Sequence, residues 1–315
     1  MKRIINYKTF INESSSENNL TPEQIYFLNK QIKGKWKLNA DGVVDVVGNI
    51  HCSHREISDF KGIKFGKVTG YFDCSNNNLT SLEGCPKEVG GHFYCSYNSL
   101  TSLEGCPKEV GGHFYCQRNN LTSLEGGPER VNGDFICYGN KLASLEFGPK
   151  EVRGTFDCSN NKLTSLEGCS KEVNGDFDCT YNKLTSLEFS PVKVGGTFDC
   201  SDNNLTSLEF GPEDVGGGFN CSRNKLTSLE GAPKEVGGTL RCFYNEGLSN
   251  ETIGLIFEKM IKSRLDYKTV LKSLWGEIPI KDKIVLYTPD LDWVEGDEAA
   301  KLSNLKKYSN IKKMI

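Results

Sequence analysis

The sequence lacks several features that would identify a membrane protein or an enzyme. No apolar run approaches the roughly 20 residues that a membrane-spanning helix needs, so we expect no membrane span. No Cys-x-x-Cys pair occurs, which argues against zinc ribbons and thioredoxin-like sites. Only four histidines are present, with no Ser/His/Asp set and no phosphate loop. We therefore expect a protein that is not an enzyme and needs no cofactor.

Charge and cysteine content argue against further classes of protein. Lys and Arg number 38 against 41 Asp and Glu, so composition gives no reason to expect nucleic acid or a membrane as a partner. The 13 cysteines are spread regularly through 315 residues, unlike the disulfide framework of a short secreted domain. Lys8 interrupts the first apolar segment and no small-residue cleavage site follows, which argues against a secretory signal. We expect free thiols in a reducing, cytoplasmic compartment.

In contrast to these absences, the chain contains a long repeat. The string LTSLEGCPKEVGGHFYC occupies residues 79–95 and recurs unchanged at 100–116. Cysteine recurs with a period of 21 from Cys74 to Cys242, usually with a phenylalanine two positions earlier and an asparagine three positions later. A fixed period of about 20–29 residues with regularly placed leucines is typical of a leucine-rich-repeat solenoid.

The repeated residues have physical roles in such a coil. Phe-x-Cys alternates with period two, so both side chains face inward from a short strand. The asparagine follows at a bend, where its amide can satisfy backbone groups of the turn and of the next rung. A Gly-Gly or Asn-Gly pair permits the turn into the strand. Proline keeps the returning segment extended. The pattern predicts parallel strands in one continuous sheet.

The repeat LTSLEGCPKEVGGHFYCSYNSL resembles the short bacterial class of leucine-rich repeats found in secreted effector proteins. Within residues 50–245, LEGCP corresponds to that family's LPxLP-like segment and FxCxxNxL to the end of its LxxLxLxxNxL segment. The resemblance implies a right-handed leucine-rich-repeat solenoid with its parallel β-sheet on the concave face and a mostly extended convex side. One departure is that Val89 and Phe93 are one residue farther apart than the family's pattern allows.

The N-terminal region carries a second resemblance. MKRIINYKTFINESSS is similar to short leaders of proteins from large tailed phages, and WKLNADGVVDVVGNI is similar to a segment of phage leucine-rich-repeat proteins. This resemblance implies a phage-encoded protein, which would act in the cytoplasm of the bacterial host.

The pattern divides the chain into four parts. Residues 1–20 are expected to form a flexible leader and 21–48 an N-terminal cap, with a helix starting at Thr21-Pro22. Residues 49–245 are expected to form ten rungs with a period of 21, and 246–315 an α-helical C-terminal cap.

The C-terminal part has two features of its own. Leu302, Leu305 and Ile311 suggest a last helix, and the final fifteen residues hold five lysines and no acid. These lysines either bind an anionic surface or form a solvated face. Some effectors of the resembling class carry a ubiquitin-ligase domain with a cysteine nucleophile after the repeats. No cysteine or histidine follows Cys242, so that chemistry is excluded here.

Residues that vary between repeats are expected to form the binding surface, because the shared residues build the coil. The outward positions are expected one and three residues before each cysteine and one and two residues after it. Adjacent repeats there carry a group that we call the Tyr/His patch: Tyr71, His92, Tyr94, Tyr97, His113, Tyr115, Gln117, Arg118, Ile136 and Tyr138. Tyrosine and arginine dominate binding at protein interfaces. The alternative is cross-strand stacking that only stiffens the sheet.

Farther along the same surface lies a second group, the Asp row, formed by Asp157, Asp178 and Asp199. Carboxylates on adjacent rungs lie about 4.8 Å apart and repel each other. Either a basic partner or a bound cation offsets this repulsion, or hydration and turn hydrogen bonds do. His51 and Cys52 should point to opposite faces of a strand, so no metal site is expected there.

Together these features favour a non-enzymatic protein–protein recognition module that binds a folded partner protein on the concave face. The phage resemblance implies that this partner is a host protein. Two other classes stay open: a structural spacer or virion/surface component, and a carbohydrate-acting enzyme that uses the Asp row. An open row of carboxylates lacks the water-excluding cleft that such an enzyme needs.

Overall fold

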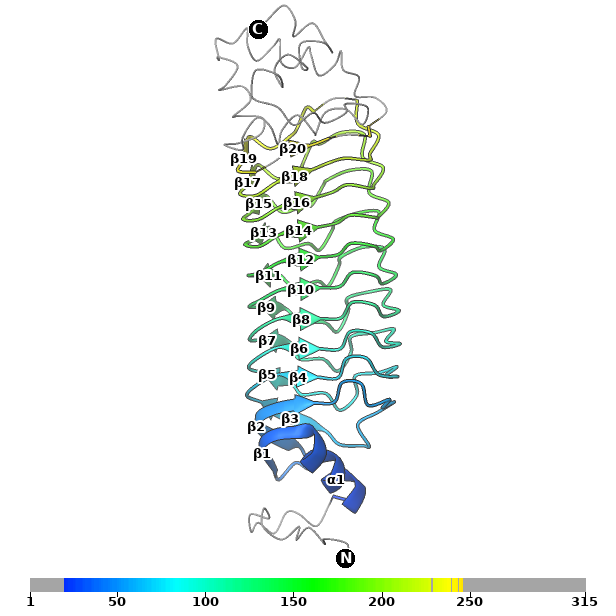
Figure 1. Ribbon diagram of the computed structural model, residues 1–315, viewed down its shortest axis with the longest axis vertical. Coiled ribbons are helices and arrows are strands. Elements are labelled where there is room, and N and C mark those ends of the chain that lie inside the picture. The colour runs from blue at the N-terminus through cyan, green and yellow to red at the C-terminus, as the bar shows by residue number, and fades with distance from the viewer. Residues whose placement is uncertain (1–19, 228, 239, 243, 246–315) are drawn as a thin grey trace, which may run out of the picture.

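The computed structural model describes residues 20–245 except residues 228, 239 and 243 (Figure 1). The predicted C-terminal cap, and all but the last residue of the predicted leader, lie outside the described residues. The described chain forms an elongated β-solenoid of short parallel strands. Eight equal steps lead from Phe72 to Leu240, so the coil makes about eight full turns.

The coil begins with helix α1 (Pro22–Gln31), which starts where the sequence predicts. The side-chain oxygen of Thr21 accepts a hydrogen bond from the backbone N–H of Gln24 at 3.2 Å, and Gln24 Oε1 accepts one from the N–H of Thr21 at 2.8 Å. This reciprocal pair satisfies N–H groups that a helix start otherwise leaves without partners. Phe27 and Leu28 are buried and join the hydrophobic core, which anchors the helix.

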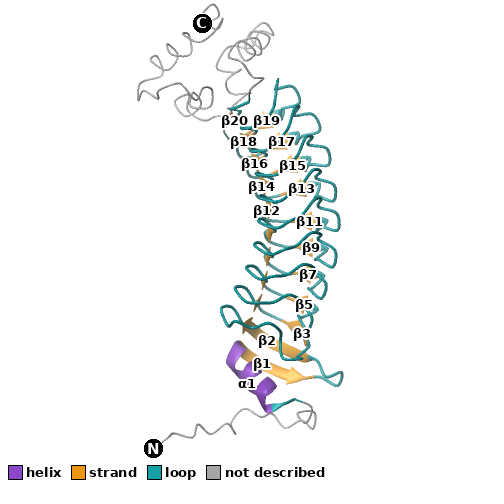
Figure 2. Ribbon diagram, turned by 90° about the vertical axis from the view of Figure 1, so that its right-hand side faces the viewer, coloured by secondary structure: helices purple, strands orange, loops and turns teal. Residues whose placement is uncertain are grey.

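Strands β1 (Ile32–Leu38) and β2 (Val44–His51) form an antiparallel hairpin at this end of the coil (Figure 2). The sequence predicts a strand over Val43–Val47, and the observed strand starts one residue later and is longer. The second edge of β2 pairs in parallel with the first turns, placing Ile50 beside Phe72. The hairpin therefore covers a strand edge that would otherwise be open to another chain.

Each turn contributes two short strands, and the two sets form two columns along the coil (Figures 1 and 2). The first column carries the Phe-x-Cys motif; after β2 it contains β4 (Phe72–Asp73), β6 (Phe93–Tyr94), β8 (Phe114–Tyr115), β10 (Phe135–Ile136), β12 (Phe156–Asp157), β14 (Phe177–Asp178), β16 (Phe198–Asp199), β18 (Phe219–Asn220) and β20 (Leu240–Arg241). The second column contains β3 (Phe65–Val68), β5 (Glu88–Val89), β7 (Glu109–Val110), β9 (Arg130–Val131), β11 (Glu151–Val152), β13 (Glu172–Val173), β15 (Lys193–Val194), β17 (Asp214–Val215) and β19 (Glu235–Val236). Equivalent residues pair in register, as Phe93 does with Phe114.

The second strand column was not predicted, but it belongs to the predicted single sheet, because β2 pairs with β3 and with β4 and so joins both columns in one 20-stranded sheet. Val89 and Val110 pair between adjacent turns and are buried, as are their equivalents along the column. The segment from Val89 to Phe93 is one residue longer than in the family that the repeat resembles. It contains the turn between the two strands of each coil turn. Among the described residues, no helix follows α1, so the side of the coil away from the first column consists of extended segments and turns.

Ladders of apolar side chains fill the interior. The phenylalanines of the first column have ring centroids 5.1–5.7 Å apart from Phe72 to Phe219. The cysteines two residues later and most of the Leu-x-x-Leu residues are fully buried beside them. Burying one phenylalanine or leucine side chain contributes about 1.5–3 kcal/mol. This gain requires a neighbouring turn, because a single turn cannot cover its own apolar side chains.

An asparagine ladder joins each turn to the one before it. Asn98 Nδ2 donates to the carbonyl of Cys95 at 3.1 Å and to that of Cys74, in the preceding turn, at 3.0 Å. Asn98 Oδ1 accepts the N–H of Leu79 at 3.0 Å. The same pattern recurs at Asn119, Asn140, Asn161, Asn182, Asn203, Asn224 and Asn245. The predicted role of the amide is confirmed, but its partner is the preceding rung rather than the next one.

The glycine two residues before each phenylalanine of the first column is required by close packing of the backbone. A Cβ on Gly175 would lie 2.7 Å from the carbonyl carbon of Gly154 in the preceding turn, and a Cβ on Gly91 would lie 2.9 Å from the carbonyl carbon of Gly70. Neither Gly91 nor Gly175 has a positive φ. These glycines therefore allow successive turns to approach each other, rather than supplying an unusual dihedral angle.

The turn after each Leu-x-x-Leu pair contains one residue with left-handed backbone angles. Glycine fills this position in five turns: Gly84, Gly105, Gly126, Gly168 and Gly231. Phenylalanine fills it in three, with φ of 64° at Phe147, 68° at Phe189 and 65° at Phe210. A residue other than glycine costs about 1–2 kcal/mol in this region. Three turns therefore contain a strain that the others avoid.

Candidate functional site

The predicted site residues all lie on one surface. They project from strands β4 to β16 of the first column, or from the residues that flank them, and all are half-buried or exposed. We call this surface the first-column face. The Tyr/His patch covers β4 to β10 and the Asp row covers β12 to β16, so the two groups are consecutive parts of one face.

Four aromatic rings form the centre of the Tyr/His patch. The rings of His92 and His113 stack with centroids 4.5 Å apart, and those of Tyr94 and Tyr115 lie 5.0 Å apart. Within each turn the histidine ring lies 5.5 Å from the tyrosine ring. The two identical repeats therefore place a two-by-two block of rings on adjacent turns.

The histidines are also hydrogen-bond acceptors. His92 Nδ1 accepts the backbone N–H of His113 at 3.0 Å, and His113 Nδ1 accepts that of Asp134 at 2.9 Å. His113 Nδ1 also lies 3.1 Å from Asp134 Oδ2, but a nitrogen that accepts an N–H has no proton to donate to this carboxylate. Accepting these bonds at Nδ1 places the ring proton on Nε2. Burial lowers the pKa of His92, and His113 lowers it further.

These bonds belong to an acceptor ladder that was not predicted. Three residues before seven of the cysteines, a side chain accepts the backbone N–H of the equivalent residue in the next turn, whereas Tyr71 and Gly218 at this position do not. The acceptors are Asn49, His92, His113, Asp134, Thr155, Asp176 and Thr197. The side chains differ, but each supplies an acceptor atom. This shared acceptor is the signal in the sequence that predicts the ladder. This column therefore supports the coil as well as shaping the face.

Two tyrosines and an arginine border the ring block. The hydroxyl groups of Tyr97 and Tyr138 lie 3.4 Å apart, and the Arg118 guanidinium carbon lies 5.5 Å from the centre of the Tyr138 ring. The hydrogen bond with Tyr97 raises the pKa of Tyr138, and burial adds to the shift. Tyr97 and Arg118 are exposed, so they present an aromatic ring and a cation at the surface.

Asp134 and Gln117 add polar groups to the patch. The Tyr115 hydroxyl donates to Asp134 Oδ2 at 3.3 Å, and burial together with Asp134 raises the pKa of Tyr115 to about 12. Asp134 was not among the predicted site residues. Gln117 Oε1 is buried and has no hydrogen-bond partner among the described residues. Leaving such an acceptor unpaired costs about 1–3 kcal/mol.

Tyr71 and Ile136 lie at the two ends of the patch. The Tyr71 ring meets the His51 ring edge-on at 6.5 Å. Ile136 pairs with Tyr115 on one side and with Asp157 on the other. Ile136 therefore marks the border between the ring block and the Asp row.

The carboxylates of the Asp row are held by their own turns. Asp157 Oδ1 accepts the backbone N–H of Ser159 at 2.9 Å and its hydroxyl at 2.6 Å. Asp178 Oδ1 accepts the backbone N–H of Thr180 at 2.9 Å. Turn hydrogen bonds, one of the two explanations left open by the sequence, are therefore present.

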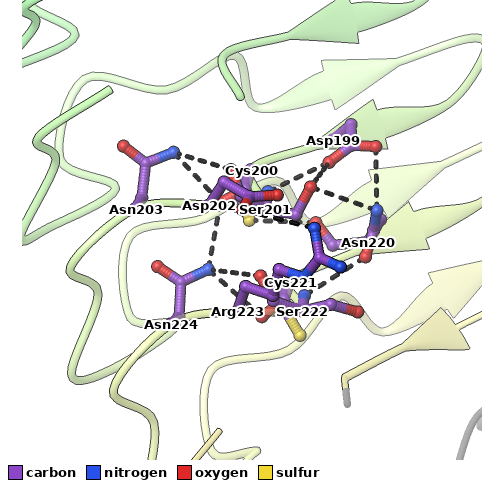
Figure 3. Close-up of polar contacts among 10 residues, drawn as sticks. All are labelled: Asp199, Cys200, Ser201, Asp202, Asn203, Asn220, Cys221, Ser222, Arg223 and Asn224. Atoms are coloured by element: carbon purple, nitrogen blue, oxygen red, sulfur yellow. Dashed lines mark hydrogen bonds and ion pairs between the residues drawn. The ribbon is translucent and has the colours of Figure 1, made fainter. Parts of the chain in front are cut away.

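Asp199 is the last residue of the row, and Figure 3 shows its contacts with Ser201 and Asn220. Its Oδ1 accepts the N–H and the hydroxyl of Ser201 at 3.0 and 2.6 Å, and its Oδ2 accepts Asn220 Nδ2 at 2.9 Å. Asn220 occupies the equivalent position in the next turn, where its own Oδ1 accepts the N–H of Ser222 at 3.2 Å. An amide at this position therefore retains the turn hydrogen bond without the charge.

The ionised carboxylates carry an energetic penalty. Burial raises the pKa of Asp157, and it raises that of Asp178 to about 6, with Asp157 and Asp199 adding to the shift. A positive group brought close to Asp178 would lower its pKa and relieve this penalty. In the part of the chain that the structure describes, no three His, Cys, Asp or Glu side chains are grouped as a metal site would require.

The column one residue after the cysteine is buried in most turns, which corrects its prediction as an outward position. The buried members are Ser53, Ser75, Ser96, Thr180, Ser201 and Ser222. Ser75 illustrates one reason, because its hydroxyl donates to Asp73 at 2.6 Å and so turns back toward the strand. Gln117 and Tyr138, both in the Tyr/His patch, are half-buried exceptions.

The cysteines are free thiols, as the sequence predicts, and nearly all are buried. Burial raises the pKa of Cys106 and Cys242 to about 12. A thiol with such a pKa remains protonated at neutral pH and is a poor nucleophile. The cysteines therefore act as small apolar side chains of the core.

Comparison with known proteins adds no relative. No protein-family model matches the chain, and no curated protein matches its sequence. Within residues 20–245, no helix has the length and apolar character required to cross a membrane. The function is therefore inferred from the first-column face itself.

Proposed function

We propose that this chain is a leucine-rich-repeat protein that binds a folded protein partner on its first-column face without catalysing a reaction. The 21-residue period and the parallel strands support the repeat class. The observation that carries the binding proposal is the block of His92, Tyr94, His113 and Tyr115 rings on adjacent turns. Aromatic side chains of this kind supply most of the binding energy at protein interfaces.

The patch is suited to recognition because its side chains are already ordered. The rings stack on each other, and the histidines are fixed by backbone hydrogen bonds, so little side-chain freedom is lost on binding. The exposed Tyr97 and Arg118 supply apolar area and a cation at the border. A partner surface with an apolar centre fits this arrangement.

The Asp row extends the face with negative charge. A basic group opposite Asp178 would relieve the burial of its carboxylate and the repulsion from its neighbours. We therefore infer a partner that is apolar opposite the Tyr/His patch and basic opposite the Asp row. Raising the salt concentration should slow association with such a partner.

We infer a bacterial cytoplasm as the compartment, with a host protein as the partner. The buried, protonated thiols are compatible with a reducing compartment. The resemblance of the first residues to phage leaders supports the phage origin.

The test is a pull-down from bacterial lysate with the tagged full-length protein. The variant Tyr94→Ser/Tyr97→Ser/Tyr115→Ser removes three rings of the patch. Tyr26→Ser is the control, because Tyr26 lies on helix α1 and not on the first-column face. Its side chain is 56% exposed, against 46% for Tyr97.

A stoichiometric partner that the wild type and the control retain, and the triple variant loses, is the expected result. A partner retained by all three proteins would exclude the Tyr/His patch as the site. Absence of any partner, together with the protein's presence in purified virions, would favour the spacer. Polysaccharide cleavage abolished by Asp178→Asn would favour the enzyme.

A further inference from the structure

An exposed apolar ridge lies away from the first-column face, in the turns between the Leu-x-x-Leu segment and the second strand column. Phe147, Phe189 and Phe210 are 63%, 51% and 69% exposed, and Val192 in the same turn as Phe189 is 52% exposed. We call these four residues the Phe ridge. They come from three of the four turns that contain Phe147 to Phe210, so the ridge spans about 14 Å along the coil.

Two independent features set the ridge apart from an ordinary exposed side chain. Each phenylalanine has left-handed backbone angles at a position where five other turns have glycine. Each also exposes a large aromatic surface that glycine would not. The sequence therefore retains both strain and exposure at three turns, although the same repeat elsewhere avoids both.

The charge beside the ridge is mixed but negative in sum: Lys150 and Lys193 lie in these turns, together with the acidic residues Glu151, Glu213 and Asp214. A glutamate precedes each phenylalanine: Glu146, Glu188 and Glu209. Within the described residues none of these three carboxylates forms a salt bridge. An occupant of the ridge should therefore combine apolar side chains with closely spaced positive charges.

One segment of this chain has that combination. Residues 301–315, KLSNLKKYSNIKKMI, place an apolar residue at every third position: Leu302, Leu305, Tyr308, Ile311 and Met314. Five lysines lie among them, and no acidic residue does. The described coil ends at Asn245, and Phe210 lies near that end, so the intervening chain, 246–300, is long enough for the segment to reach the ridge.

We propose that the Phe ridge is the docking site of the chain's own C-terminal segment, residues 301–315. The apolar residues of the segment cover the phenylalanines, and its lysines pair with the neighbouring glutamates. Because the segment and the ridge belong to one chain, the high effective concentration makes a small contact area sufficient. The docked segment leaves the first-column face free.

Hydrogen–deuterium exchange on the full-length protein tests this proposal. The variant Phe147→Gly/Phe189→Gly/Phe210→Gly removes the ridge and installs the residue that five other turns already use, so the coil is retained. We expect peptides from 301–315 to exchange about tenfold faster or more in the variant than in the wild type. Peptides from the first strand column should exchange equally in both and thereby report an intact coil. Equal exchange of 301–315 in the two proteins would overturn the proposal.

Charge variants with a matched control test the second part. Glu146→Gln/Glu188→Gln/Glu209→Gln should also accelerate exchange of 301–315. Glu83→Gln/Glu104→Gln/Glu125→Gln changes the same position in turns that have glycine in place of phenylalanine, and it should have no effect. Equal effects of the two charge variants would contradict specific pairing at the ridge.

A photo-crosslinking residue at position 189 distinguishes the occupants. A crosslink within one chain to 301–315 is expected. A crosslink between two copies, with protection that disappears on dilution, would assign the ridge to self-association and overturn the proposal. A crosslink only to another protein in lysate would overturn it as well.

Discussion

The backbone N–H of His113 donates a hydrogen bond to Nδ1 of His92 over 3.0 Å, between two turns of identical sequence. A side chain of one repeat therefore completes the backbone of the next. Nδ1 must be unprotonated to accept this bond, so protonation of His92 would break it. The same bond fixes one ring of the proposed binding surface, because His92 belongs to the Tyr/His patch.

His92 should resist protonation in the folded protein. Burial and the neighbouring His113 lower its pKa below the unfolded value of about 6.5. The folded state then binds fewer protons, so the stability from this group is present above about pH 6.5 and is lost as the pH falls through the folded-state pKa. An NMR titration should give a lower pKa for His92 in the native protein than in denaturant. A native value equal to or above the denatured one would contradict this.

Replacing His92 by asparagine should reduce the pH dependence of stability without removing the acceptor. Asn49 fills the equivalent position in an earlier turn, where its Oδ1 accepts the N–H of Tyr71 at 2.9 Å. Denaturant unfolding at neutral and mildly acidic pH measures the effect. His54→Asn is the control, since His54 is exposed and lies outside the acceptor ladder.

Removing one amide of the asparagine ladder should be strongly destabilising. Asn119 donates to the carbonyls of Cys95 and Cys116 and accepts the N–H of Leu100, at 3.0–3.1 Å. Asn119→Ala removes three hydrogen bonds and leaves the buried N–H of Leu100 unsatisfied, whereas the carbonyls of Cys95 and Cys116 keep the amides of Asn98 and Asn140 as donors. We therefore expect a loss of about 1–3 kcal/mol in the free energy of unfolding. Asn120→Ala, one residue later and only half-buried, should cost much less. Similar costs for both variants would show that the ladder contributes little.

Neutralising the centre of the Asp row should stabilise the coil at neutral pH. The folded-state pKa of Asp178 is about 6, above the unfolded value of about 3.9. The penalty for its charge is thus absent below about pH 4, grows between pH 4 and 6, and is complete above about pH 6. Asp178→Asn should raise the free energy of unfolding by about 1–3 kcal/mol at neutral pH and by little at pH 4.

A control for this variant is Asp41→Asn at an exposed turn, which should leave the pH dependence unchanged. A stabilisation by Asp178→Asn that is the same at both pH values would show that the carboxylate charge is not its cause. If a basic partner covers the row, the same substitution should weaken its binding.

Native cysteines should be inert toward thiol reagents. The raised pKa values and burial of residues such as Cys106 and Cys242 leave almost no accessible thiolate at neutral pH. Ellman's reagent should label none of the 13 cysteines rapidly in the native protein and all of them after unfolding. Rapid labelling of several native thiols would contradict the buried ladder.

Close approach of the turns requires the glycine two residues before each phenylalanine of the first column. Gly175→Ala places a Cβ 2.7 Å from the carbonyl carbon of Gly154 and from the backbone nitrogen of Thr155, so we expect it to cost about 3 kcal/mol or to displace the neighbouring turn. Gly42→Ala is the comparison. A Cβ at Gly42 meets nothing within 4 Å, although φ is +73°, so its cost should stay near about 1 kcal/mol. Thermal unfolding of the two variants measures the difference.

The spacing of Phe93, Cys95 and Asn98 was sufficient to predict the coil, its inward-facing side chains and the role of the amide. It did not predict the second strand column, because Glu88–Val89 is a strand of two residues whose pairing partner lies one turn away. A strand of two residues is too short to show a period-two pattern in the sequence. It forms because equivalent residues of stacked turns pair, and a sequence repeat predicts the stacking without predicting the conformation of the stacked segment.

The candidate face was predicted in position but not in all its bonding. Alternation along the strand placed Tyr94 and Asp157 outward, as observed. The acceptor role of His92 was missed because the residues of that column share an acceptor atom rather than a side-chain type. The serine column was placed outward wrongly because hydrogen bonds such as that of Ser75 with Asp73 fold it back.

The asparagine ladder also bears on how such a chain can change over generations. Its bonds join equivalent positions of adjacent repeats at the same offsets along the coil, so each unit offers the same junction to its neighbours. Loss of residues 79–99 would place Asn119 where Asn98 stood and leave one His/Tyr pair fewer on the surface. Gain of such a unit would lengthen the ring block by one pair. Duplication or loss of whole repeats can therefore lengthen or shorten the first-column face without disrupting the fold.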